Sequence, residues 1–81
     1  MSKKIRIRER KLGRQRAYGL YYHYEDLIEI DPRQSTKTYL NTLCHELLHK
    51  AIPEIGENKI TKAASILSRG ILQQNFRRIM K

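Results

Sequence analysis

The sequence has very little cysteine and no long apolar run. Cys44 is its one cysteine, so an internal disulfide is impossible. Such chains are typical of reducing compartments, and we therefore expect a cytoplasmic protein. No apolar stretch approaches the length needed to cross a bilayer, and no apolar segment of a secretory signal follows the charged first residues. We expect no membrane partner.

Acidic residues are also scarce. The 81 residues include 17 Lys and Arg but 8 Asp and Glu, for a formal net charge of +9. Residues 1–24 hold eight of the basic residues and Glu9 as their one acid, a local charge of +7. Such an imbalance is typical of proteins that bind an acidic partner, most often nucleic acid. Residues 3–16 are therefore a candidate nucleic-acid contact, and a solvated basic arm is the alternative.

Alternating apolar residues predict short strands in the first half of the chain. Near the N-terminus isoleucines alternate with arginines, which favours a half-exposed strand. Residues 17–24 are rich in Tyr, a good strand former, and residues 27–31 alternate again. Because the turn-forming pair Glu25-Asp26 lies between them, the two segments predict a β-hairpin, which Pro32 ends.

Helical spacing follows the hairpin. Ser35 or Thr36 can cap a helix that runs to about Ala51. We expect its core stripe to pack on the sheet, with Cys44 and Leu48 on the flank of that stripe. The stripe consists of Leu40, Leu43, Leu47 and Ala51. On this interpretation two histidines and Thr42 face outward.

A second helix is predicted from Glu57 to about Phe76, after Pro53 and Gly56 break the chain. Its apolar stripe consists of Ile60, Ala64, Leu67 and Ile71. Glu57 lies at the start of that stripe. A carboxylate on the buried side of a helix needs a partner.

The strongest functional signal is the H-E-x-x-H motif of His45, Glu46 and His49. Two histidines four residues apart lie one turn apart on a helix, so both can bind one zinc ion. Glu46 lies near that face, on the exposed flank of the helix, where it can accept a proton from a zinc-activated water. The alternative is a pair of surface histidines beside an ordinary solvated glutamate.

A catalytic zinc ion commonly takes three protein ligands and keeps one position open. Glu54 and Glu57 are the downstream candidates for the third ligand. We favour Glu57, because it begins a helix that can fold back along the first and because it lies on the apolar stripe. A first-turn carboxylate that interacts with the helix dipole is the alternative role for Glu57.

Three residues near the hairpin turn are candidates to stabilise the oxyanion of a tetrahedral intermediate. They are Tyr22, His23 and Tyr24. Alternatively, the tyrosines pack on the sheet and His23 is exposed. Cys44 points about a hundred degrees away from His45 on the helix, and we interpret it as a small core residue rather than a ligand.

The segments 27–33 and 39–49, together with Pro53 and the pair Gly56-Glu57, resemble small HExxH zinc metallopeptidases of the gluzincin and SprT-like type. Phage and bacterial genomes often encode such proteins, and the resemblance extends over residues 17–78. It implies a strand-rich N-terminal part, an active-site helix, and a following helix that supplies a glutamate ligand. We expect this chain to lack the substrate-binding subdomain and the long C-terminal extension of larger members.

The resemblance implies zinc ligands at His45, His49 and Glu57, with Glu46 as the general base. The implied fold is α+β and zincin-like. A short antiparallel sheet of two or three strands packs on the active-site helix and on a second, C-terminal helix.

On this interpretation, residues 1–16 are a basic arm or edge strand and residues 17–81 form a minimal zincin-like metallopeptidase domain. The implied function is zinc-dependent hydrolysis of peptide bonds in a peptide or protein substrate. A basic nucleic-acid-binding protein with a structural or vestigial zinc site is the alternative.

Overall fold

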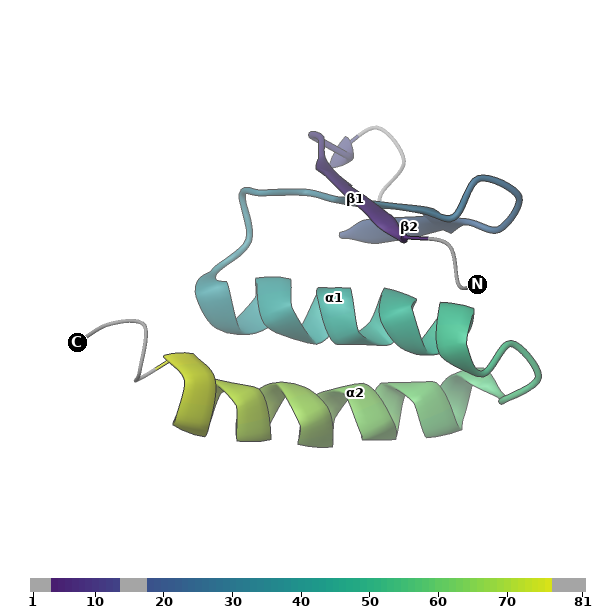
Figure 1. The fold of residues 1–81 in the computed structure, drawn as a ribbon. Coiled ribbons are helices and arrows are strands. Elements are labelled where there is room, and N and C mark those ends of the chain that lie inside the picture. The colour runs from purple at the N-terminus through teal and green to yellow at the C-terminus, as the bar shows by residue number, and fades with distance from the viewer. Residues whose placement is uncertain (1–3, 14–17, 77–81) are drawn as a thin grey trace.

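The computed structural model describes residues 4–13 and 18–76, which form three layers (Figure 1). A sheet packs on one side of helix α1, Thr36–Ala51, and helix α2, Glu57–Ile71, packs on the other side. The predicted α+β class is confirmed, and the helix with the H-E-x-x-H motif is the central layer. Within these residues, no helix is long and apolar enough to cross a membrane.

The sheet contains β1, Arg6–Glu9, β2, Gly19–Tyr22, and β3, Leu27–Ile30, in the order β1-β3-β2. β2 and β3 form the predicted antiparallel hairpin. β1 runs parallel to β3, with Arg6 opposite Leu27, so the prediction of a wholly antiparallel sheet was wrong. Alternation along a strand predicts which side chains share a face but not the direction of its neighbour, which explains the error.

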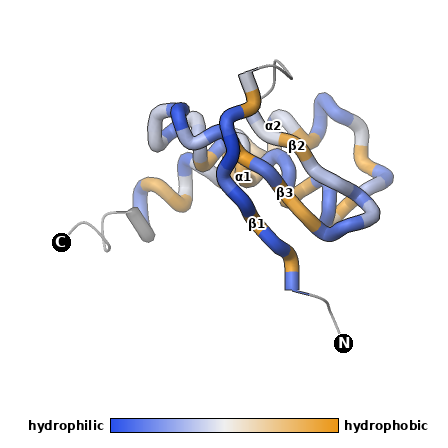
Figure 2. The backbone as a smooth tube through the Cα atoms, turned by 90° about the horizontal axis from the view of Figure 1, so that it is seen from above, coloured by the Kyte–Doolittle hydropathy of each residue, from blue (hydrophilic) through white to orange (hydrophobic). Residues whose placement is uncertain are grey.

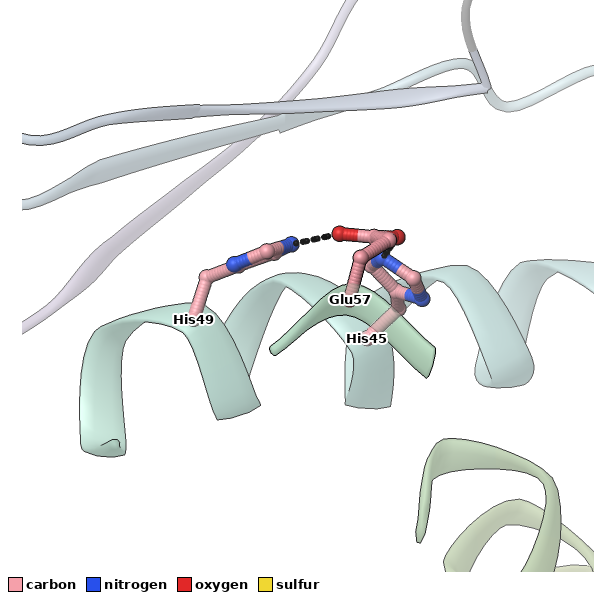
Figure 3. Close-up of side chains that lie close together, drawn as sticks. All are labelled: His45, His49 and Glu57. Atoms are coloured by element: carbon pink, nitrogen blue, oxygen red, sulfur yellow. Dashed lines mark ion pairs between the residues drawn. The ribbon is translucent and has the colours of Figure 1, made fainter. Parts of the chain in front are cut away.

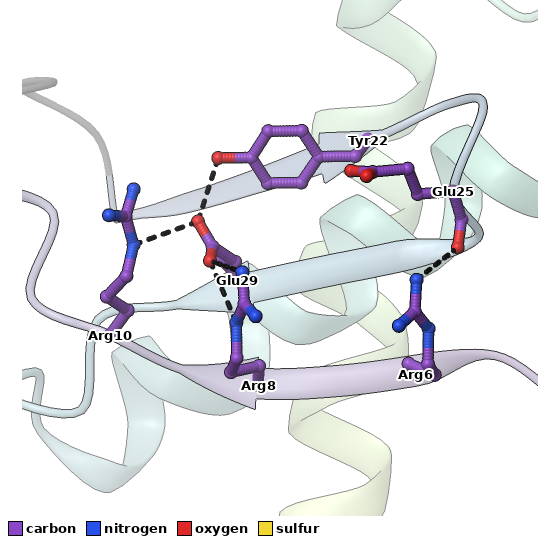
Figure 4. A network of polar contacts seen from close by, with 6 residues as sticks. All are labelled: Arg6, Arg8, Arg10, Tyr22, Glu25 and Glu29. Carbon is purple, nitrogen blue, oxygen red and sulfur yellow. Dashed lines mark hydrogen bonds and ion pairs between the residues drawn. The ribbon is translucent and has the colours of Figure 1, made fainter.

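The two faces of the sheet differ in chemistry. Ile28 and Ile30 point toward α1 and are fully buried. Glu29 points to the opposite, outer face, yet it is only 1% exposed because arginine and tyrosine side chains cover it (Figure 4). β1 is hydrophilic over most of its length beside this buried strand (Figure 2). β3 is thus the core strand, and β1 covers one of its edges.

Asp31 ties the segment after β1 to the end of β3. Its carboxylate accepts hydrogen bonds from the backbone N–H of Leu12 at 2.9 Å and from Arg33. The hydrogen bonds from the Arg33 side chain, with those from the two backbone N–H groups, hold the pKa of Asp31 well below its usual range. Leu12 is fully buried beside this contact, so the segment after β1 belongs to the core.

Helix α1 begins where the sequence predicted. Ser35 is the N-cap, and its side chain accepts a hydrogen bond from the backbone N–H of Thr38 at 3.3 Å. The helix ends at Ala51, as expected, and Ile52 donates its backbone N–H to the carbonyl of Leu48.

The prediction of which side of α1 meets the sheet was wrong. A methyl group built on Gly19 of β2 would lie 2.6 Å from Cγ2 of Thr42 and 3.3 Å from Cγ of Glu46. The sheet therefore covers the side of α1 that carries Thr42 and Glu46, which was expected to face outward. Cys44, expected on the flank, is the buried residue of this helix, whereas Ala51 is exposed. A helix packed on two sides has no single apolar stripe, and this explains the error.

Helix α2 begins at Glu57, as predicted, but its α-helical part ends at Ile71 and continues as a π-helical segment, Leu72–Phe76. The buried positions are Ile60, Ala64 and Ser68. Leu67, predicted in the core, is 46% exposed. Ser68 is a polar residue on this buried stripe, and its hydroxyl accepts a hydrogen bond from the side chain of Asn41 of α1 at 3.3 Å.

Candidate metal centre

The side chains of His45, His49 and Glu57 converge where the two helices meet (Figure 3). Nε2 of His45 lies 2.7 Å from Oε2 of Glu57, and Nε2 of His49 lies 3.1 Å from Oε1 of the same carboxylate. The candidate ligand atoms all lie within 4.8 Å of one another. This group can in principle hold a metal ion.

Local structure explains why these three residues meet. The four-residue spacing on α1 places the imidazole rings of His45 and His49 one turn apart, with centroids separated by 5.0 Å. The short connection 52–56 then reverses the chain, and α2 packs back along α1. Glu57 is the first residue of α2, so the reversal returns its carboxylate to the two histidines.

The donor set fits a zinc ion. Zinc prefers imidazole nitrogen and carboxylate oxygen, and a tetrahedral ion with bonds of about 2.0–2.1 Å separates neighbouring ligand atoms by about 3.3 Å. The nitrogen–oxygen distances of 2.7 and 3.1 Å are slightly shorter than this separation. A small outward movement of Glu57, whose side chain is 62% exposed, would therefore make room for the ion.

Glu46 lies beside the group but on the side of α1 that β2 covers. It is half-buried, so the expectation of an exposed flank was wrong. Burial raises the pKa of Glu46; the charges of His45 and His49 oppose that shift, and the charge of Glu57 adds to it. A carboxylate held partly out of water in this way is a stronger base than a solvated one.

The other candidates from the sequence lie elsewhere. The hydroxyl of Tyr22 donates to Oε1 of Glu29 at 2.8 Å on the outer face of the sheet, away from α1 (Figure 4). His23 and Tyr24 are exposed at the hairpin turn, where their rings make an edge contact. Glu54 is exposed in the connection between the helices, and among the described residues the candidate ligand group contains Glu57 instead.

Tyr21 is a residue that the sequence analysis did not select. It pairs with Ile28 on the α1 side of β2 and interacts electrostatically with Lys50 of α1. Strand alternation places Tyr21 on the same face as Gly19, and this signal could have identified it. It is therefore the tyrosine of β2 that points toward the motif helix.

Comparisons with known proteins add no family assignment. A scan against protein-family models, a search of curated proteins and a search of solved structures each found no match to this chain. The H-E-x-x-H motif and the geometry around it are therefore the features of this chain that point to a function.

Proposed function

We propose that the protein is a zinc-dependent metallopeptidase. The observation that carries this proposal is the convergence of two histidine nitrogens, from His45 and His49, on the carboxylate of Glu57. A zinc ion held by these three side chains would polarise a peptide carbonyl and make a water molecule more acidic.

Glu46 would supply the acid–base chemistry. It would accept a proton from the attacking water and deliver it to the leaving amine. Its position directly after His45 and the rise in its pKa caused by burial support this role. Tyr22 does not contribute to this chemistry, because its hydroxyl is bonded to Glu29 on the other face of the sheet.

An extended peptide is the substrate class that the sheet favours. β2 is an edge strand, and it lies over α1 next to Glu46, as the close approach at Gly19 indicates. A peptide that pairs with the outer edge of β2 through backbone hydrogen bonds would lie along the same side of α1. Such pairing would present successive peptide bonds to the metal group and to Glu46.

The test combines metal content with peptide hydrolysis. Reconstituted protein should bind one zinc ion per chain and cleave members of a broad peptide library, and a chelator should abolish cleavage. Glu46→Gln keeps the shape of the side chain but removes the base, so this variant should bind zinc normally and lose activity by a factor on the order of a hundred or more.

Glu54→Gln is the matched control, because it makes the same chemical change outside the ligand group. It should retain both zinc and activity. Equal cleavage by the parent and by Glu46→Gln would overturn the assigned base. Failure of the parent to bind zinc, or to cleave any peptide, would overturn the proposed function.

A further inference from the structure

The outer face of the sheet carries a row of arginines on its β1 edge (Figure 4). Arg6, Arg8 and Arg10 alternate along the chain and so share this face, and the backbone N–H of Arg10 extends the ladder by donating to Ile30 at 3.0 Å. Neighbouring members of the row are about 6.6 Å apart along the strand. We call these three residues the arginine row.

A buried carboxylate orients two members of the row. Arg8 donates to Oε2 of Glu29, and Nε of Arg10 donates to Oε1 at 3.1 Å. Burial alone would raise the pKa of Glu29, but the hydrogen bonds from Tyr22 and Arg8 and the charges of the two arginines together lower it. Glu29 therefore stays ionised and fixes both guanidinium groups.

The row keeps an excess of positive charge and free donors. Three arginines share this face with the carboxylates of buried Glu29 and exposed Glu25, which leaves a local charge of +1 by subtraction (Figure 4). The side chains of Arg8 and Arg10 are 60% and 48% exposed, and each guanidinium has five N–H donors, more than its bonds to Glu29 use. Glu9, the acid within this strand, points to the other face, where the hydroxyl of Tyr39 donates to it at 2.7 Å.

We propose that the arginine row binds the phosphate backbone of a single-stranded nucleic acid. Its spacing is comparable to that of successive phosphates along an extended strand, and its guanidinium groups present fixed donors that suit phosphate oxygens. A single row of guanidinium groups can contact the phosphate backbone of one strand along its length. Exposed tyrosine rings at Tyr18 and Tyr24, at the two ends of β2, offer surfaces on which bases can stack.

This surface is separate from the candidate metal centre. The row lies on the outer face of the sheet, whereas the histidines lie on α1, beneath the opposite face (Figure 1). Binding of nucleic acid should therefore be unchanged by a chelator. This independence distinguishes the proposal from the proposed peptidase activity.

The experiment measures the affinity of the full chain for a fluorescently labelled oligo(dT) strand by anisotropy at several salt concentrations. Three phosphate contacts predict a slope of about −2 in a plot of log affinity against log salt. Arg6→Gln removes one contact without touching Glu29, because Arg6 bonds the backbone carbonyl of Glu25 instead. This variant should reduce the slope by about 0.7 and the affinity about fivefold at 0.1 M salt.

Lys62→Gln is the matched control, because it removes the same charge from the exposed side of α2, in the opposite outer layer. It should leave affinity nearly unchanged, and circular dichroism should show that both variants are folded. An equal loss in both variants would mean that net charge alone drives binding. That result, the absence of salt-dependent binding by the parent, or tighter binding of a duplex than of the single strand would overturn the proposal.

Discussion

Replacing Gly19 with alanine would test the close approach of β2 to α1. The new methyl carbon would lie 2.6 Å from Cγ2 of Thr42, well inside the distance at which two carbon atoms can rest. Thr42 cannot turn away without loss, because its hydroxyl donates to Oε1 of Gln34 at 2.8 Å. The strand or the helix must therefore move.

Overpacking of this kind costs about 1–3 kcal/mol. A partial offset of about 0.4–1 kcal/mol comes from the smaller conformational entropy of alanine in the unfolded chain, since no described glycine has a positive φ. We expect a net loss of about 1–2 kcal/mol in the free energy of unfolding. In a domain of this size, the corresponding fall in Tm is about 4–16 °C.

Thr42→Ser makes the prediction specific. It removes Cγ2 and keeps the hydroxyl that bonds Gln34. In the Thr42→Ser background, the methyl carbon at residue 19 would meet Cγ of Glu46 at 3.3 Å and the carbonyl of Glu29 at 3.4 Å, so a shift of a few tenths of an ångström by the Glu46 side chain would relieve the overlap. Urea unfolding followed by circular dichroism should therefore show a coupling of about 1 kcal/mol between the two substitutions. If Gly19→Ala costs the same in both backgrounds, or nothing in either, the assigned approach of β2 to α1 is wrong.

Two further predictions concern the metal group and pH. Glu57→Ala should weaken zinc binding at least tenfold in a competition titration, whereas Glu54→Ala should change it little; the reverse result would move the third ligand to Glu54. Glu29 and Asp31 have pKa values below their ordinary 4.5 and 3.8, so the stability they contribute is complete above those values and lost as the pH falls below them. Tm should fall between pH 5 and pH 2 by this mechanism, and a flat profile in thermal unfolding would refute it.

Local signals in the sequence predicted the hairpin, the start of α1 and the start of α2. These signals are a Ser-Thr capping pair, a break between Pro and Gly, and the period of alternation. Each depends on a few adjacent residues, so it can be recognised without knowledge of the tertiary structure. The meeting of His45, His49 and Glu57 was predictable for the same reason. Helical spacing places the two histidines on one side of α1, and the short reversal between the helices returns Glu57 to them.

Long-range packing was not predictable from the same patterns. Alternation along the strand places Glu29 on the face opposite Ile28 and Ile30, but it does not show that Arg8 and Arg10 of β1 cover that face and bury Glu29. Similarly, the burial of Glu46 depends on Gly19, which lets β2 approach α1 closely. Each of these contacts joins segments that are far apart in sequence.

The parallel pairing of β1 with β3 has a consequence for how the chain folds. β2 and β3 are joined by a short turn, so they can pair early in folding. The pairing of β1 with β3 instead joins Arg6 to Leu27, which are 21 residues apart by subtraction, and therefore closes a longer loop. Until β1 docks, the edge of the apolar strand β3 is open to a strand from another chain. Arginines along β1 are charges of the kind that discourage such mispairing. We therefore expect loss of β1 to produce aggregation during refolding before it produces any large loss of helix.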